Sequence, residues 1–297
     1  MLSGIKQYKI KNMRNLSLNM LEGVSIEKPR AVALNVHGMG SCFQLDYKED
    51  SLIYRNNILK NNNIKSYAFE FIGHGKSDGI RCSIDNFDDF VDDLDTIVKF
   101  IKKKEDNIPI FIISESMGGA VAIKYCIKNQ LKSKIDGYIL VGPMCGLDDS
   151  LKPHPIMINF LLFISKYFPN YPAIGTKIDV NGSCKNKEFT KLKENSEYFF
   201  NEQTRLNTGR ELYNTSLWIE ENGDLFNAPV YVLHGLDDKI TNPEFSIKFY
   251  NNVVCKNKDI YLPKNTNHSL FIRVDDNDKG PIKTWENIIN WINLQIK

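Results

Sequence analysis

The sequence predicts an α/β protein with a mainly parallel β-sheet that helices cover on both faces. Two observations lead to this prediction. Short apolar runs, typical of buried strands, alternate along the chain with longer segments of helical pattern. Each run is followed by a turn, in several cases at a glycine, before the next helical segment begins. Chains that alternate in this way form parallel sheets, because each helix carries the chain back to the start of a neighbouring strand.

The elements follow one another in a regular order. The expected strands are residues 31–36, 65–71, 108–113, 137–141, 229–233 and 259–262. The expected helices are residues 46–61, 86–103, 117–129, 243–253 and 282–296. In sheets of this kind, ligands bind in the loops beyond the carboxyl ends of the strands, and we expect the functional residues there.

The alternation is interrupted between residues 149 and 227, where several prolines and charged helical segments occur. We interpret this stretch as a lid insertion in a single domain, whose core is formed by residues 1–148 and 228–297. Within the lid, residues 156–168 are strongly apolar. We expect an ordinary buried helix there; the alternative is a lid helix that faces an acyl chain or a membrane surface. The segment is too short to span a bilayer.

Composition excludes several classes of protein. The 297 residues are 42% hydrophobic and 25% charged, which is typical of a globular protein. The net charge is +2, so no strong electrostatic field favours the binding of nucleic acid. Residues 1–22 lack the continuous apolar core of a signal peptide. The cysteines form no CxxC pair or zinc-ligand spacing, which favours free thiols in a reducing compartment. We therefore expect a cytoplasmic protein, with contact to a membrane surface left open. The cysteines are Cys42, Cys82, Cys126, Cys145, Cys184 and Cys255.

A candidate nucleophile stands between a strand and a helix. Ser116 lies in the segment Ser114-Glu115-Ser116-Met117-Gly118-Gly119, directly after the strand at 108–113 and before the helix at 117–129. A sharp turn at this place would hold the serine hydroxyl up at the end of the sheet. The alternative is an ordinary N-cap serine. Ser114 departs from the usual pattern, which has glycine at this position.

A serine nucleophile needs a histidine base, and five histidines are available. His37 and His74 lie in early loops, His154 lies in the lid, and His234 ends a strand. A nucleophile elbow is followed in the chain first by the acid and then by the histidine. Only His268 stands in the required place, after the last expected strand and before the last helix.

The acid that orients this histidine should follow the strand at 229–233. Leu236-Asp237-Asp238-Lys239 offers two adjacent aspartates. A buried carboxylate there would hold the histidine tautomer and stabilise the imidazolium. The spacing from Gly235 favours Asp238, and Asp237 remains the alternative.

The loop His37-Gly38-Met39-Gly40 fits one half of an oxyanion hole. Its glycines free the backbone, so that the N–H of Met39 can point into the site. The N–H of Met117, at the start of a helix, would supply the other donor. The alternative for the first loop is an ordinary glycine turn.

Five segments together resemble the monoacylglycerol lipase and lysophospholipase branch of the α/β-hydrolases. The resemblance extends from about residue 30 to residue 270, in the expected order. It implies an α/β-hydrolase fold, a Ser116–Asp238–His268 triad, an oxyanion hole at Met39 and Met117, and an acyl-ester lipid as substrate. The segments are His37-Gly38-Met39-Gly40, Gly73-His74-Gly75-Lys76-Ser77, Ser116-Met117-Gly118-Gly119, Gly235-Leu236-Asp237-Asp238 and Asn267-His268.

We therefore predict a serine hydrolase that cleaves a fatty-acyl ester of a lysophospholipid or a monoacylglycerol through an acyl-enzyme. The alternatives are a thioesterase, a small-ester carboxylesterase or an acyltransferase with the same triad, and a ligand-binding hydrolase without turnover. The chain lacks the HExxH, Walker A and GxGxxG patterns, so we expect no metal and no cofactor. Acyl length, head group and oligomeric state stay open.

Overall fold

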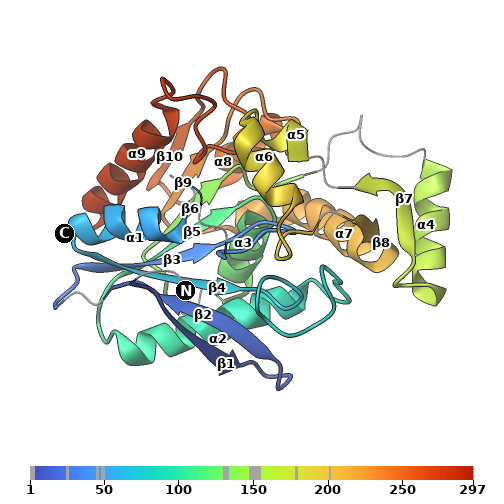
Figure 1. Cartoon of the computed structure of the whole chain (residues 1–297), viewed down its shortest axis with the longest axis horizontal. Coiled ribbons are helices and arrows are strands. Elements are labelled where there is room, and N and C mark those ends of the chain that lie inside the picture. The colour runs from blue at the N-terminus through green and yellow to red at the C-terminus, as the bar shows by residue number, and fades with distance from the viewer. Residues whose placement is uncertain are drawn as a thin grey trace.

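A central sheet of eight strands organises the molecule (Figure 1). The structure is a computed structural model that describes residues 4–24, 27–44, 47, 51–129, 134–146, 155–177, 180–200 and 202–296. The strand order is β1-β2-β4-β3-β5-β6-β9-β10. The strands are β1 (Lys6–Lys11), β2 (Ser17–Glu22), β3 (Ala31–Val36), β4 (Ile64–Glu70), β5 (Ile110–Glu115), β6 (Gly137–Val141), β9 (Val230–Leu233) and β10 (Lys258–Tyr261).

From β4 to β10 all neighbouring strands are parallel, and only β1 and β2 run antiparallel to their neighbours. Val36 therefore pairs with Ser114, and Val141 pairs with both Glu115 and Leu233. This register brings the carboxyl ends of β3, β5, β6 and β9 to one edge of the sheet. The predicted strands and the α/β fold class are confirmed. The hairpin of β1 and β2 was not predicted.

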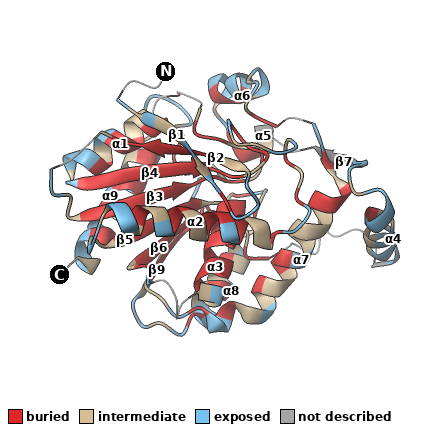
Figure 2. Ribbon diagram, turned by 90° about the horizontal axis from the view of Figure 1, so that it is seen from below, coloured by how far each residue is buried: buried red, intermediate tan, exposed pale blue. Residues whose placement is uncertain are grey.

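Helices cover both faces of the sheet (Figure 2), and the strands between them are buried. α2, α3 and α8 pack on one face, where their apolar side chains join one core cluster. α1 and α9 pack on the other face and join a second cluster. These helices are α1 (Leu52–Asn61), α2 (Asp88–Lys104), α3 (Met117–Asn129), α8 (Pro243–Asn252) and α9 (Gly280–Gln295).

The helix starts agree with local chemistry. The side chain of Ser51 accepts a hydrogen bond from the N–H of Tyr54 and caps α1. Asn242 caps α8 in the same way, and Pro243 occupies the first turn, where its missing N–H costs nothing. α2 ends in three lysines, which suit the negative end of the helix dipole.

The elements of the predicted lid lie between β6 and β9. β7 and β8 pair as a small antiparallel sheet. α7 returns the chain to the core, where Ile219 is buried in the same cluster as α3. Residues 147–154, which include the predicted start of the lid and His154, lie outside the described residues. The elements are α4 (Pro155–Tyr167), β7 (Pro172–Lys177), α5 (Val180–Ser183), α6 (Lys187–Glu194), β8 (Gln203–Arg205), α7 (Leu206–Asn222) and the short 3₁₀ helix η3 (Gly223–Leu225).

Candidate active site

Ser116 occupies a strained turn between β5 and α3. Its φ angle is +54°, in the left-handed region that non-glycine residues rarely adopt. The N–H of Ser116 donates to the carbonyl of Val141 at 3.0 Å, and its own carbonyl accepts from Met144 at 3.0 Å. These bonds to the end of β6 and to the loop after it hold the turn in place. Strain of this kind is typical of the nucleophile elbow that the sequence predicts.

The two glycines after the turn are required by close contacts with neighbouring segments. A Cβ on Gly118 would lie 2.5 Å from the carbonyl oxygen of His37, and one on Gly119 would lie 2.6 Å from Cβ of Pro143. Ser114 is accommodated in place of the usual glycine because it is a regular strand residue. Its side chain is buried, and the hydroxyl lies 3.4 Å from the carbonyl of Ile139.

Asp238 and His268 meet at this edge of the sheet. Oδ2 of Asp238 lies 2.6 Å from Nδ1 of His268. Oδ1 accepts from the N–H groups of Ile240 and Thr241, at 2.8 and 3.1 Å. Burial alone would raise the pKa of Asp238, but the two neighbouring histidines, His268 and His234, hold it well below its usual range. The carboxylate is therefore ionised and oriented toward His268.

The geometry decides which of the two candidate aspartates can orient the histidine. Asp238 is buried, whereas the side chain of Asp237 is 45% exposed and lies 3.7 Å from Nζ of Lys185. Only Asp238 contacts a histidine in the part of the chain that the structure describes.

His234 is a second imidazole on the same carboxylate, which sequence reasoning did not find. Its Nε2 lies 2.9 Å from Oδ2 of Asp238, and its Nδ1 lies 2.7 Å from the hydroxyl of Ser246. The hydroxyl of Thr241 adds a third contact to Oδ2 at 2.9 Å. The only signal in the sequence is that His234 stands four residues before Asp238.

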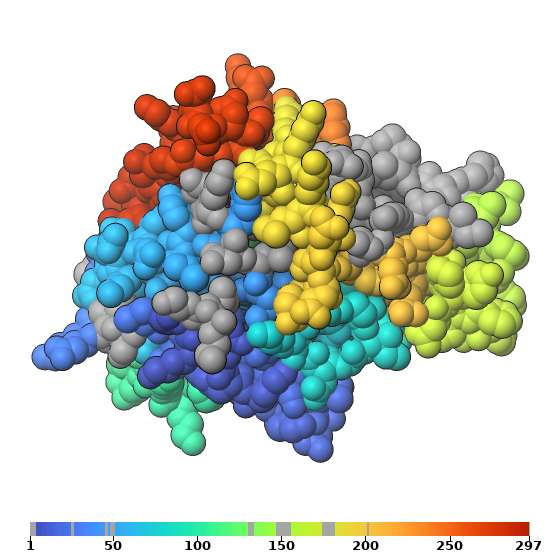
Figure 3. Space-filling model, viewed as in Figure 1, coloured from blue at the N-terminus to red at the C-terminus, as the bar shows by residue number. Residues whose placement is uncertain are grey.

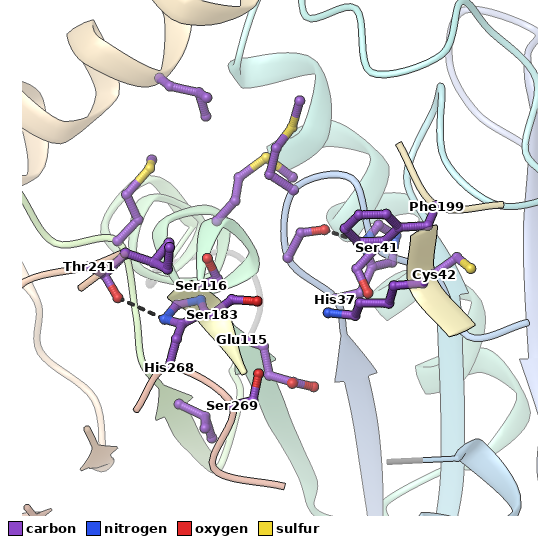
Figure 4. A pocket seen from close by; sticks show the side chains of 18 of the residues that line it. His37, Ser41, Cys42, Glu115, Ser116, Ser183, Phe199, Thr241, His268 and Ser269 are labelled. Carbon is purple, nitrogen blue, oxygen red and sulfur yellow. Dashed lines mark hydrogen bonds between the residues drawn. The ribbon is translucent and has the colours of Figure 1, made fainter. Parts of the chain in front are cut away.

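Ser116 and His268 lie side by side at one end of a cavity (Figure 4). Within the described residues their side chains form no direct hydrogen bond. Catalytic contacts of this kind are often long until a substrate binds. The structure thus brings Ser116, Asp238 and His268 together, as the sequence predicts.

The loop after β3 lies against the nucleophile. Cβ of an alanine at Gly38 would be only 2.9 Å from Cβ of Ser116. His37 anchors this loop: it contacts the carbonyl of Gly38 through Nδ1 at 2.8 Å, and its Nε2 accepts from the N–H of Phe71 at 3.1 Å. Burial, with a smaller effect from His74, lowers the pKa of His37 to about 3, so the ring is neutral. His37 is therefore a structural residue.

The two residues whose N–H groups are the expected oxyanion donors lie at the same cavity. Met39 and Met117 both line it. In the described chain, the N–H of Met39 donates to no backbone carbonyl. Met117 opens α3, and the first N–H groups of a helix have no partner within the helix. Both donors are thus available to a ligand.

The cavity has a volume of about 420 Å³, within the range typical of small-molecule sites. Its wall is largely apolar on the side of α7 and the loop after β6, where Met144, Leu212 and Tyr213 lie. Polar and charged side chains gather on the side of α1, α5 and α6. They include Arg55, Glu115, Ser183, Lys193 and Ser269.

An ion pair in this polar wall was not predicted. Arg55 is buried on α1, and its Nη1 lies 2.6 Å from Oε1 of Glu115, the residue before the nucleophile. The guanidinium also lies 4.5 Å from the ring centroid of Phe271. The two partners are distant in the sequence, so nothing in the local pattern connects them.

Comparison with known proteins decides the family. A family model described as "Serine aminopeptidase, S33" matches residues 27–275, most of the chain. The chain belongs to this family. It is an α/β-hydrolase of the monoacylglycerol lipase group and a carboxylic ester hydrolase, as its relatives indicate.

Several curated relatives of this hydrolase are named lipases or esterases. It is 26% identical to the monoglyceride lipase of Saccharomyces cerevisiae, with 82% of this chain and 78% of the relative covered. It is 23% identical to the caffeoylshikimate esterase of Arabidopsis thaliana, with 78% and 69% covered. It is 26% identical to the phospholipase YtpA of Bacillus subtilis, with 67% and 74% covered.

Solved structures support the fold of the hydrolase. A soluble variant of the Saccharomyces cerevisiae monoglyceride lipase, in complex with a substrate analogue, superposes with a TM-score of 0.78. The sequences are 21% identical, and the match covers 98% of this chain and 94% of the other. At this identity the likeness concerns the fold alone.

The lid of the hydrolase differs from the sequence prediction in one respect. α4 is not an ordinary buried helix: it projects at one end of the molecule (Figures 2 and 3). Its large apolar side chains are exposed. Periodicity alone could not reveal this, because an apolar helix has the same pattern in either setting. No helix among the described residues is long and apolar enough to cross a bilayer. The exposed side chains are Ile156, Met157, Phe160, Phe163, Tyr167 and Phe168.

Proposed function

We propose that the protein hydrolyses a fatty-acyl ester of a single-chain lipid, a lysophospholipid or a monoacylglycerol. Ser116 is the nucleophile, His268 the base and Asp238 the orienting acid. The observation that carries this proposal is the short contact between Asp238 and His268 beside Ser116, at the end of a largely apolar cavity. The curated relatives that are named lipases and a phospholipase support the choice of substrate class.

The proposed reaction has two halves. Oγ of Ser116 forms a bond to the ester carbonyl carbon while His268 takes the hydroxyl proton. The N–H groups of Met39 and Met117 then stabilise the oxyanion, each contributing about 2.7–4 kcal/mol if it behaves as such donors usually do. The bond to the alcohol breaks, and His268 returns the proton to the leaving oxygen.

In the second half, water attacks the acyl-enzyme. His268 accepts a proton from the water and gives it to Ser116 Oγ as the fatty acid leaves. Asp238 stays ionised throughout and stabilises the imidazolium, in keeping with the lowered pKa of its carboxyl group.

The exposed face of α4 extends this proposal to the membrane surface. Single-chain lipids are held in bilayers and other aggregates, so an enzyme that hydrolyses them benefits from contact with the lipid–water interface. Phe160 and Phe163 are 54% and 58% exposed, which makes α4 suited to lie in such an interface.

The proposal is tested by fatty-acid release from lysophosphatidylcholine and from monoacylglycerol, with wild type beside Ser116→Ala. We expect release by wild type and a loss of about 10⁴-fold or more in the variant. Labelling of wild type by a fluorophosphonate, absent in Ser116→Ala, would identify the nucleophile independently. Labelling without release from either lipid would overturn the lipid substrate and favour a small ester or a thioester. Neither release nor labelling would leave a ligand-binding protein without turnover.

A further inference from the structure

Lys193 brings a positive charge to the wall of the cavity. It lies on α6 of the lid and lines the cavity together with Phe189 and Phe199. Its Nζ is 4.7 Å from the ring centroid of Phe189 and 5.0 Å from that of Phe199. Both rings are buried, so they hold the ammonium between them by cation–π contacts. The lysine is therefore positioned, unlike a lysine on an open surface.

The other charged groups of the cavity wall compensate one another. Arg55 and Glu115 form an ion pair at 2.6 Å. Asp238 stands behind His268 and already accepts hydrogen bonds from several donors. Lys193, by contrast, has no salt-bridge partner among the described residues. Among the residues that the structure describes, the uncompensated charge of the wall is thus a single ammonium group.

The ammonium lies away from the reacting serine. In Figure 4, Phe199 stands on the far side of the cavity from Ser116 and His268, together with Ser41 and Cys42. Because Lys193 packs on Phe199, its charge is also on that far side. A substrate group that contacts Lys193 would therefore lie far from the ester carbonyl. The apolar wall by Met144 and Leu212 is better suited to the acyl chain.

We propose that Lys193 binds the phosphate of a lysophospholipid head group and makes the enzyme prefer lysophospholipids to monoacylglycerols. This inference rests on the proposed hydrolysis of single-chain lipids. A phosphate is the anion that separates these two substrate classes, because a monoacylglycerol carries no charge. An ammonium in a cavity of low polarity forms strong, charge-assisted hydrogen bonds with phosphate oxygens.

The test compares two substrates with the same acyl chain, 1-oleoyl lysophosphatidylcholine and 1-oleoyl glycerol. Lys193→Met keeps an unbranched side chain and removes the charge. We expect kcat/KM for the lysophospholipid to fall by about tenfold or more, mainly through KM, with little change for the monoacylglycerol. The matched control is Lys191→Met, since Lys191 is exposed on the same helix and does not line the cavity. It should change neither substrate.

A binding measurement separates this inference from the proposed reaction. An ether-linked lysophosphatidylcholine has no ester bond, so its Kd can be measured on protein that does not turn over. We expect Lys193→Met to raise this Kd by about tenfold. An equal loss on both substrates would mean that Lys193 only packs the lid. Unchanged lysophospholipid kinetics and an unchanged Kd would overturn phosphate recognition, while release of fatty acid that depends on Ser116 would still support the hydrolase. If no lipid is hydrolysed, the Kd alone decides the role of Lys193.

Discussion

Nε2 of His234 lies 2.9 Å from the same oxygen of Asp238 that His268 approaches to 2.6 Å. His234 is fully buried, and its other nitrogen lies 2.7 Å from the hydroxyl of Ser246. Nε2 also lies 2.8 Å from the carbonyl oxygen of Thr241. Because a carboxylate and a carbonyl can only accept, Nε2 of His234 carries a proton. His234 therefore donates to Asp238 and fixes the carboxylate from a second direction.

We expect His234→Ala to lower kcat/KM for a soluble ester by about 10- to 100-fold. The substitution removes a hydrogen bond to a charged group, worth about 1.5–3 kcal/mol, and leaves the position of Asp238 less well defined. Ser246→Ala removes only the contact to the far nitrogen and should lower activity much less. Activity is measured beside the thermal unfolding midpoint. A loss of activity that only follows a loss of folded protein would contradict a positioning role.

A second prediction concerns the contact between Gly38 and the nucleophile. The Cβ of Gly38→Ala would lie 2.9 Å from Cβ of Ser116 and 3.3 Å from the carbonyl oxygen of Glu115. The loop must shift, which displaces the N–H of Met39. We expect kcat to fall by about 10²–10³, the usual loss when one oxyanion donor is removed. An unchanged kcat would show that Met39 is not a donor.

Gly209 provides a matched control for this substitution. A Cβ there would meet nothing within 4 Å, and Gly209 lies within α7. Because Gly209 lines the cavity, it is a control for stability and not for activity. Gly209→Ala should therefore raise the free energy of unfolding by about 0.5–1 kcal/mol, as alanine does in a helix interior. Urea unfolding of both variants checks that the effect of Gly38→Ala is local.

A third prediction concerns acid stability. Burial alone would raise the pKa of Glu22, but hydrogen bonds from Lys104 and Lys65 lower it to about 2, from an ordinary value of 4.5. A lowered pKa in the folded state stabilises the protein above pH 4.5, and this contribution is lost as the pH falls toward 2. Since Lys104 is partly exposed, solvent screens part of the effect, and we expect about 1–2 kcal/mol at neutral pH.

Glu22→Gln should therefore lower the free energy of unfolding at pH 7, and its difference from wild type should shrink as the pH falls below about 4.5. Unfolding by urea at several pH values measures both effects. Glu286→Gln is the control, because Glu286 is exposed on α9. A difference that stays constant with pH would contradict the ionic origin of the stabilisation.

A fourth prediction tests the exposed face of α4. The double substitution Phe160→Asp and Phe163→Asp should reduce the fraction of protein that floats with phospholipid vesicles by tenfold or more, because each buried phenylalanine contributes about 1.5–3 kcal/mol. Hydrolysis of a soluble short-chain ester should persist. Leu294→Asp is the control: Leu294 is 74% exposed, on α9. An equal loss in this control, or no vesicle binding by wild type, would refute membrane contact through α4.

The parts of the molecule that follow from local patterns were predicted well. Buried parallel strands are short apolar runs, and the helix after Ser116 begins and ends at the predicted residues. The order of Ser116, the acid and His268 limited the choice of histidine, and the contact between Asp238 and His268 agrees with it. The sequence did not decide between Asp237 and Asp238 as the acid, because the conformation of the loop determines which of two adjacent side chains points toward the histidine.

Other features depend on long-range contacts that no local pattern encodes. The strand β1 is an edge strand with lysines on it, so its composition resembles a loop. Arg55 contacts Glu115 only because α1 packs beside the end of β5. The exposure of α4 depends on how far the lid extends from the core, which hydrophobicity does not report.

The lid leaves the sheet after β6 and returns to it at β9, and these two strands are hydrogen-bonded neighbours, with Tyr138 beside Val230 and Val141 beside Leu233. Both junctions are thus fixed by the sheet and not by the lid. A loop of another length or sequence can be joined between them without changing the pairing of any strand. The wall that faces the substrate can therefore differ among related proteins, or be exchanged between them by grafting. The residues that would cleave the ester can stay the same.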